Sequence, residues 1–274
     1  MDAPVRILAC ASAEQPASSP SKDDAVRDVP VSDGIAALGS YVVAFDCETD
    51  ALFGRWSGQT ERDHFLRTTM NFTVVCAAVL PTAAVFSGKT IDDCLKGVQH
   101  RSFWRDDNRS ACPVDELLAL FDGAAAIVGY NHLAFDFPLL QRFYVSFGAQ
   151  SRAHGLARYY SHRAKSLDLM TRVQEVVGWR PKLDSLLKEN GMHPKTASGV
   201  EAVRMWEEQR RDELEEYCRV DTEQTLRLAL LHGSLSCGGT RVPEEAFGLR
   251  PFLAARAWAS WAQRLGAVRR HETA

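Results

Sequence analysis

The sequence predicts one mixed α/β domain, with an antiparallel meander of strands, further strands that pair in parallel, and flanking helices. Two features carry this prediction. Apolar runs of strand length come early in the chain, at SYVVAFDCE (40–48) and TVVCAAVL (73–80). Later segments instead space their apolar residues as helices do, and several end at glycine. Strands followed mainly by helices are typical of a sheet that helices cover.

The first strand is expected at residues 40–48, close to where the ordered part of the chain begins. Residues 1–30 are rich in Ala, Ser, Pro and Asp, so we expect a disordered leader there, with an organellar transit peptide as the alternative. A second strand at 73–80 and a third at AAVFSG (83–88), joined at Pro81, would complete the meander.

One more strand and a series of helices are expected in the rest of the domain. The polar stretches 51–71 and 89–112 are interpreted as insertions or long loops. PVDELLALFDG (113–123) has acidic residues in its first turn and a closing glycine, as helices do, and AAAIVGYN (124–131) follows as a strand. Further helices are expected at HLAFDFPLLQRFYVSFG (132–148), SLDLMTRVQEVVG (166–178), KLDSLLKENG (182–191), EAVRMWEEQRR (201–211) and ELEEYCRVDTEQTLRLALLHG (213–233).

Length and composition fit one main domain with a tail at each end. The 274 residues are 46% hydrophobic, enough for a single well-buried core, which we assign to residues 31–235. Residues 236–274 are predicted to form an amphipathic helical extension that packs back on the domain, or contacts a partner, a membrane surface or nucleic acid. Lys and Arg number 32 against 35 Asp and Glu, so any binding to a polyanion requires a local basic surface.

The cysteines favour a reducing intracellular compartment. There are seven, an odd number, without a C-x-x-C pair, and most lie in apolar runs. This pattern is typical of buried thiols rather than of disulfides or a zinc site. We expect no membrane span, because no window approaches the roughly 18 apolar residues that one requires.

Two acidic residues end the first predicted strand. Asp46 and Glu48 are one residue apart, so their side chains leave the same face of the strand and can share metal ions. Carboxylates gathered beside apolar segments are costly unless a cation joins them, and two magnesium ions are a natural solution. The alternative is that the pair has no function, since D-x-E is common at strand ends.

Two further pairs of polar residues attract attention. Asn131 ends a predicted strand and Asp136 follows in the first turns of a helix, although an Asn turn followed by an ordinary surface aspartate is the favoured explanation when this pair is taken alone. Tyr217 and Asp221 are four residues apart, so on a helix they share a face and can meet one ligand. Such a pair is also commonplace when taken alone.

The three motifs together, D-x-E, N-x-x-x-F-D and Y-x-x-x-D, resemble the DEDD superfamily of 3′-to-5′ exonucleases, which is DnaQ-like and of ribonuclease H-like fold. The tyrosine places the resemblance in the subgroup shared with polymerase proofreading domains, because the histidine subgroup would carry His near position 217. The resemblance spans residues 41–232. SLDLM and KLDSLLKENG are similar to the spacer of polymerase-B-type exonuclease domains.

This resemblance implies a site that binds two Mg²⁺ or Mn²⁺ ions. The four metal-binding carboxylates would be Asp46, Glu48, Asp136 and Asp221, and Tyr217 would orient the attacking water. In this hypothesis Asp46 bridges the ions, Glu48 and Asp221 complete the position that activates water, and Asp136 helps to hold the second ion. The phenol of Tyr217 is too weak an acid to take the proton at neutral pH, so we expect it to position the water.

The resemblance also suggests residues that touch the substrate. Asn131 and Phe135 would contact the terminal nucleotide, and Leu52 or Phe53 would wedge against its base. The segment 152–195 holds an excess of basic residues, including Lys165, with Tyr159, Tyr160 and Trp179 nearby, and is interpreted either as a track for a single strand or as solvated helical surface. Asp168 is either a supporting acid or a helix N-cap, and His154, His162 and His193 either lie on the surface or contact phosphate.

We therefore expect a two-metal-ion 3′-to-5′ exonuclease that releases nucleoside 5′-monophosphates from single-stranded DNA. DNA is favoured over RNA by the polymerase-B-like spacer, and an RNA exonuclease of the same fold is the first alternative. A non-catalytic nucleic-acid-binding subunit is the second. A polymerase or a repair or processing partner could bind through the C-terminal helix or through the stretches 51–71 and 89–112.

Overall fold

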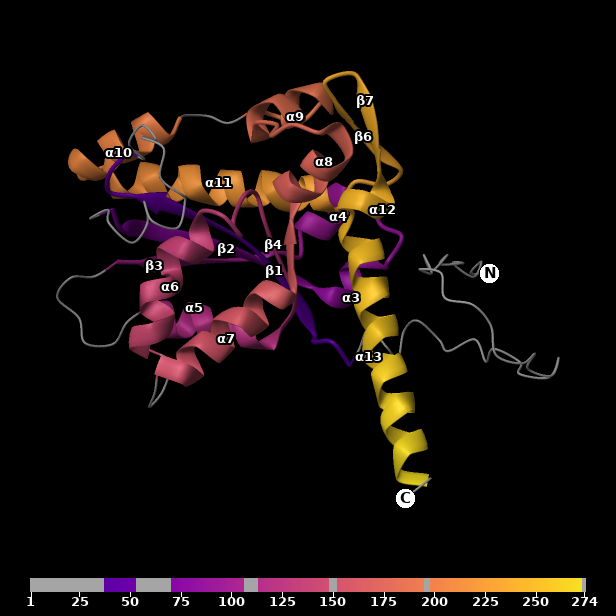
Figure 1. Cartoon of the computed structure of the whole chain (residues 1–274). Helices are drawn as coiled ribbons and strands as arrows, with labels where there is room; N and C mark the ends of the chain where they lie inside the picture. The colour runs from indigo at the N-terminus through magenta and orange to yellow at the C-terminus, as the bar shows by residue number, and fades with distance from the viewer. Residues whose placement is uncertain (1–36, 53–69, 106–112, 148–151, 195–197, 273–274) are drawn as a thin grey trace.

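A five-stranded mixed sheet forms the centre of the molecule (Figure 1). The computed structural model describes residues 37–52, 70–105, 113–147, 152–194 and 198–272. The strand order is β3-β2-β1-β4-β5; β1, β2 and β3 are antiparallel neighbours, and β4 and β5 continue in parallel with β1. This confirms the predicted fold class. The strands are β1 (Tyr41–Thr49), β2 (Phe72–Pro81), β3 (Gln99–Trp104), β4 (Ala124–Gly129) and β5 (Ser166–Asp168).

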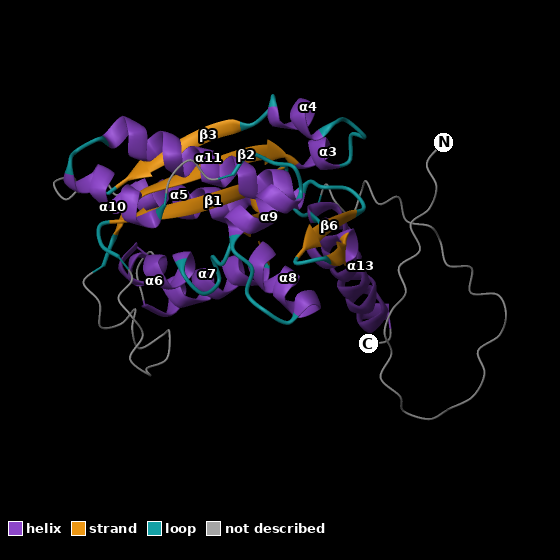
Figure 2. Ribbon diagram, turned by 90° about the horizontal axis from the view of Figure 1, so that it is seen from above, coloured by secondary structure: helices purple, strands orange, loops and turns teal. Residues whose placement is uncertain are grey.

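Helices cover both faces of this sheet (Figure 2). On one face the long helix α11 crosses β1, β2 and β4, and on the other α5 lies against β1 and β4 with α6 and α7 packed beside it. A small hairpin and a long final helix complete the fold. The elements are α3 (Thr82–Val85), α4 (Ile91–Leu95), α5 (Pro113–Gly123), α6 (Asp136–Phe147), α7 (Arg152–Ala164), α8 (Leu169–Val177), α9 (Leu183–Glu189), α10 (Gly199–Glu207), α11 (Arg211–Ala229), β6 (Ser234–Cys237), β7 (Thr240–Pro243), α12 (Glu244–Phe247) and α13 (Leu249–Glu272).

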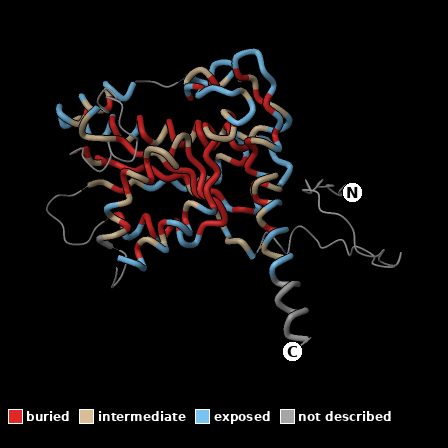
Figure 3. Tube along the Cα trace, in the orientation of Figure 1, coloured by how far each residue is buried: buried red, intermediate tan, exposed pale blue. Residues whose placement is uncertain are grey.

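Alternation along β1 decides which groups face which layer. Val42 and Ala44 belong to the buried cluster on the α11 side, whereas Val43 and Phe45 belong to the cluster on the side of α5 and α6. Figure 3 shows this central sheet as the most deeply buried part of the chain. Because even-numbered side chains of β1 face α11, Asp46 and Glu48 are directed towards that helix.

The third strand of the meander is not where the sequence predicted it. Residues 83–88 were expected to be a strand, but Thr82–Val85 form the short helix α3, and the third strand is β3, within the stretch 89–112 predicted to be a loop. β3 is an edge strand whose first three residues are exposed, so it lacks an apolar run that would reveal it. Its place is set by pairing with β2, which includes Val75 opposite Phe103.

Three more segments depart from the prediction. The basic connection before residue 166 contains the helix α7, Ser166–Asp168 form β5 instead of starting a helix, and the predicted C-terminal extension begins with the β6–β7 hairpin. The predicted boundary at residue 235 falls inside β6. Leu249 and Leu253 of α13 are buried in the same cluster as Val42, while the far part of α13 extends away from the body (Figure 1).

The described part of the chain agrees with two further expectations. Cys47, Cys76, Cys94, Cys218 and Cys237 are buried free thiols, and Cys10 and Cys112 lie outside the described residues. In the same described ranges, every helix is too short or too polar to cross a membrane. The predicted leader at residues 1–30 lies outside them as well.

Candidate active site

The carboxyl-terminal end of β1 presents two acids to helix α11. Glu48 is buried and Asp46 is half-buried. A carboxylate oxygen of Asp46, one of Glu48 and the thiol sulfur of Cys218 lie within 4.8 Å of one another. The Cys218 Sγ donates to the backbone oxygen of Asp46 at 3.4 Å, so α11 is seated directly on this part of β1. Sequence reasoning had placed Cys218 only in the core.

Helix α11 places Tyr217 and Asp221 against the same two acids. Both residues are buried, although the helix is polar overall. Burial raises the pKa of Tyr217 above its ordinary value of 10, and the neighbouring carboxylates, chiefly that of Asp221, raise it further. The predicted spacing of four residues therefore puts both side chains on the helix face that covers β1. Tyr217 keeps its proton at neutral pH.

Asp136 reaches the site from the other side of β1. Strand β4 pairs with β1 only as far as Ala44, opposite Val128, so the backbone of Cys47 lies beyond the end of β4. The Cys47 N–H donates to Asp136 Oδ1 at 3.0 Å. Burial, and next the negative charge of Asp46, raise the pKa of Asp136 well above its ordinary value. The structure thus joins Asp136 to the β1 acids, as the motif predicted.

The carboxylates at this end of β1 suit hard divalent cations as ligands. Carboxylate oxygens are the ligands that Mg²⁺ and Mn²⁺ prefer, and Asp46, Glu48, Asp136 and Asp221 supply them from one strand and two helices. Burial first, and next the repulsion of neighbouring carboxylates, raise the pKa values of both Asp136 and Tyr217. A cation bound there would relieve that repulsion.

Only some of the predicted substrate residues lie at the end of the sheet that carries the acids. Asn131 follows the end of β4 with a left-handed backbone (φ 65°), and its Oδ1 accepts from Arg180 at 2.8 Å. Phe135 is half-buried in the cluster beside α6. Leu52 is 54% exposed just beyond β1, and Phe53 lies outside the described residues.

Lys165 does not reach the site. It precedes β5, at the opposite end of that strand from the acids, and its Nζ donates to the backbone oxygen of Asp122 at 2.8 Å. The prediction that Lys165 contacts substrate is not supported by this placement. Several other basic residues of the segment 152–195 also serve internal contacts; Arg158 pairs with Asp122, and Arg163 donates to the backbone oxygen of Leu133.

His162 is another correction. Instead of lying on the surface or contacting phosphate, it is 1% exposed and bridges Tyr144, at 2.7 Å, and Asp122, at 2.6 Å. Sequence spacing gave no sign of this network, because its members come from three different helices. Asp168 is the N-cap of α8, accepting from the Thr171 N–H at 3.2 Å. Arg180, which sequence reasoning included only among many basic residues, is exposed beside Asn131.

Comparison with protein families identifies the superfamily of this fold. A family model described as the RNase H superfamily matches residues 88–232, which is more than half of the chain and includes Asp136, Tyr217 and Asp221. The chain belongs to the ribonuclease H superfamily. Nucleases of this superfamily generally use divalent metal ions, in keeping with the carboxylates that the fold gathers here.

Comparison with solved structures gives a match to a polymerase. It is a family B DNA polymerase from the hyperthermophilic archaeon Pyrobaculum calidifontis, with 18% sequence identity and a TM-score of 0.45. The match covers 69% of this ribonuclease H superfamily protein and 24% of the polymerase, so the chain spans about a quarter of the polymerase's length. A search of the curated proteins gave no match.

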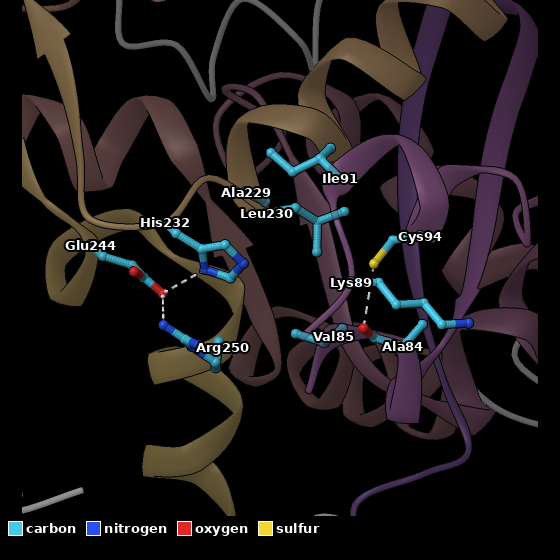
Figure 4. Close-up of a pocket in the computed structure, with 10 residues that line it drawn as sticks. All are labelled: Ala84, Val85, Lys89, Ile91, Cys94, Ala229, Leu230, His232, Glu244 and Arg250. Carbon is cyan, nitrogen blue, oxygen red and sulfur yellow. Dashed lines mark hydrogen bonds and ion pairs between the residues drawn. The ribbon is translucent and has the colours of Figure 1, made fainter. Parts of the chain in front are cut away.

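A small pocket of this ribonuclease H superfamily protein lies far from the acids. Figure 4 shows it between α3, α4, the end of α11 and the start of α13, with Glu244 paired to Arg250 and His232. Pro81, which precedes α3, pairs with Tyr41 at the start of β1. The pocket therefore adjoins the end of β1 opposite to the acids. Its volume of about 10 Å³ is room for one water molecule, not for a nucleotide.

Proposed function

We propose that this protein is a metal-dependent 3′-to-5′ exonuclease that releases nucleoside 5′-monophosphates from the ends of single-stranded DNA. The observation that carries the proposal is the convergence of separate elements on one point. Asp46 and Glu48 of β1 face Tyr217 and Asp221 of α11, and Asp136 is hydrogen-bonded to the backbone of β1. The 3′-to-5′ direction and the tyrosine subgroup rest on the resemblance of these motifs to the DEDD exonucleases.

The carboxylates would hold two Mg²⁺ or Mn²⁺ ions, which when bound supply an activated water and stabilise charge on the attacked phosphate and the leaving oxygen. In this proposal Asp46 would help to hold both ions, Glu48 and Asp221 would help to hold the ion that activates water, and Asp136 would help to hold the other. Because Tyr217 stays protonated, its hydroxyl orients the attacking water by a hydrogen bond and does not remove the proton.

Substrate contacts belong to the same end of the sheet. Asn131 and Phe135 would contact the terminal nucleotide, and Leu52 would pack against its base. The exposed guanidinium of Arg180 stands beside Asn131 and suits a phosphate. DNA is proposed over RNA because SLDLM and KLDSLLKENG are similar to the polymerase-B-type spacer. Polymerase or repair partners are proposed to dock through α13 or the insertions.

The test is degradation of single-stranded DNA and RNA labelled at either end, with Mg²⁺ or Mn²⁺, by wild type and Asp46→Asn. We expect metal-dependent shortening from the 3′ end, mononucleotide products, and loss of at least about 100-fold in rate in the variant. A matched control is Asp115→Asn, which neutralises an aspartate with a 62% exposed side chain on α5.

Each other outcome leads to a different conclusion. Faster cleavage of RNA than of DNA would move the proposal to an RNA exonuclease. Binding of nucleic acid without cleavage by any variant would replace the enzyme with a non-catalytic binding subunit. Equal activity of Asp46→Asn and Asp115→Asn would show that Asp46 of β1 does not take part in cleavage.

A further inference from the structure

The turn between β4 and α6 decides where Asp136 lies. This turn, residues 130–135, folds tightly: the N–H groups of Ala134 and Phe135 both donate to the backbone oxygen of Asn131. Asn131 itself has a left-handed backbone, which costs free energy for a residue other than glycine. Such a conformation persists only when surrounding groups hold it. Asp136 begins α6 directly after this turn, so any relaxation of the turn moves its carboxylate.

One buried carboxylate holds the turn. Asp168 is 2% exposed, its Oδ1 accepts from the Asn131 N–H at 3.0 Å, and its Oδ2 accepts from the Leu133 N–H at 2.9 Å. Its Oδ1 also caps α8 through the N–H of Thr171. Hydrogen bonds to an ionised acceptor are about twice as strong as neutral ones. A helix cap needs only the Thr171 contact, and the other two tie the turn to β5.

Other groups enclose the same turn. The His132 ring is fully buried, with Nδ1 3.6 Å from Asp168 Oδ2, and a Cβ at Gly129 would lie only 2.6 Å from that Nδ1. Arg163 donates to the backbone oxygen of Leu133 at 2.7 Å. The backbone of the turn is thus held at Asn131 by Asp168 and at Leu133 by both Asp168 and Arg163.

We propose that Asp168 is a positioning residue for the nuclease site, which fixes Asn131 and Asp136 by anchoring the turn between them. This inference rests on the proposed function for its catalytic consequence. Asp168 touches neither substrate nor metal; it acts through the backbone of Asn131 and Leu133. Groups that orient metal ligands in this way typically change activity or metal affinity by about 10- to 100-fold when they are removed.

The test separates the turn from the helix cap by comparing Asp168→Ser with Asp168→Asn. Serine is a good N-cap but too short to reach Asn131 and Leu133, so it keeps α8 capped and releases the turn. Asparagine keeps the size of the side chain but replaces one acceptor oxygen with a donor group. The control Ser198→Ala removes a different N-cap, that of α10.

For Asp168→Ser we expect kcat to fall by about tenfold or more, with a higher Mn²⁺ concentration at half-maximal activity. Hydrogen exchange of the Asn131 and Leu133 amides should accelerate by about tenfold, while the Thr171 amide stays protected. The kcat and the amide exchange rates of Asp168→Asn should lie between those of Asp168→Ser and wild type. Ser198→Ala should change only the stability of the fold. Asp168→Asn also serves if Asp168→Ser fails to fold.

If Asp168→Ser has the same kcat, the same Mn²⁺ dependence and the same amide exchange as wild type, the inference is overturned and Asp168 is only a helix cap. Inactivity of the wild type on every substrate would instead overturn the proposed function. In that case amide exchange at Asn131 and Leu133, and direct Mn²⁺ binding measured by calorimetry, still decide whether Asp168 holds the turn.

Discussion

The surroundings of Tyr217 constrain the chemistry of its side chain. Burial and the carboxylate of Asp221 keep its phenol protonated, so the role left to it is hydrogen bonding. We predict that Tyr217→Phe slows single-turnover cleavage by about 100-fold, comparable to removing one preorganised donor from an active site. Mn²⁺ binding measured by calorimetry should be largely unchanged.

The control for this prediction is Tyr160→Phe, which alters a tyrosine that is 65% exposed on α7. It should cleave as fast as wild type. If Tyr217→Phe also retains the wild-type rate, the hydroxyl does not orient the water. If it loses Mn²⁺ binding instead, the hydroxyl supports the carboxylates and not the nucleophile.

Spacing in the sequence predicted which acids would meet but not what holds them. Asp46 with Glu48, and Tyr217 with Asp221, share a face because of strand and helix periodicity, which local sequence reveals. The bond from Cys47 to Asp136 spans 89 residues and that from Leu133 to Asp168 spans 35. Such contacts depend on how β4 pairs with β1 and β5 pairs with β4 in the sheet, which no local pattern encodes.

Among the elements, α13 tests where the domain ends. Leu253 is fully buried against the same cluster as Val42, whereas Trp258, five residues later, is 53% exposed. We propose that the catalytic domain continues into the first turns of this helix. Leu253→Ala should lower the free energy of unfolding by about 2–5 kcal/mol, as large-to-small changes in cores do.

Urea unfolding measures this loss, and Trp258→Ala is the matched control on the same helix. Exposed substitutions usually change stability by less than about 0.5 kcal/mol. Equal stability of the two variants would mean that α13 adds nothing to the stability of the core.

Several of the elements that sequence patterns missed share a physical cause. β3 is an exposed edge strand, α3 and β5 are three or four residues long, and α7 is rich in basic and polar residues. None of them has apolar residues at a spacing that predicts the element it forms. The buried elements β1, β2, β4 and α5 carry continuous or periodic apolar residues and were predicted closely.

For the molecule as a whole, stability should fall in acid because of a buried histidine. Burial lowers the pKa of His162 to about 4 from an ordinary value of 6.5. The unfolded chain therefore takes up a proton below pH 6.5, while the folded state does so only near pH 4. The stabilisation is complete above pH 6.5 and is lost as the pH falls between these values.

Comparing wild type with His162→Gln isolates this effect from other titrating groups. Between pH 7.5 and pH 5, wild type should lose about 2 kcal/mol more free energy of unfolding than the variant does. Urea titrations at the two pH values measure the difference. His193→Gln, at an exposed position, should follow wild type. An identical loss in His162→Gln and wild type would show that His162 titrates normally in the fold.

The thiol of Cys218 and the backbone of Asp46, in contact at the site, are 172 residues apart in the chain. A ribosome synthesises β1 and α6 long before α11, which brings Tyr217 and Asp221. Until α11 has emerged and packed across the sheet, a growing chain has only part of its candidate active site. On the proposed function, a nascent chain gains nuclease activity only after α11 has packed across the sheet.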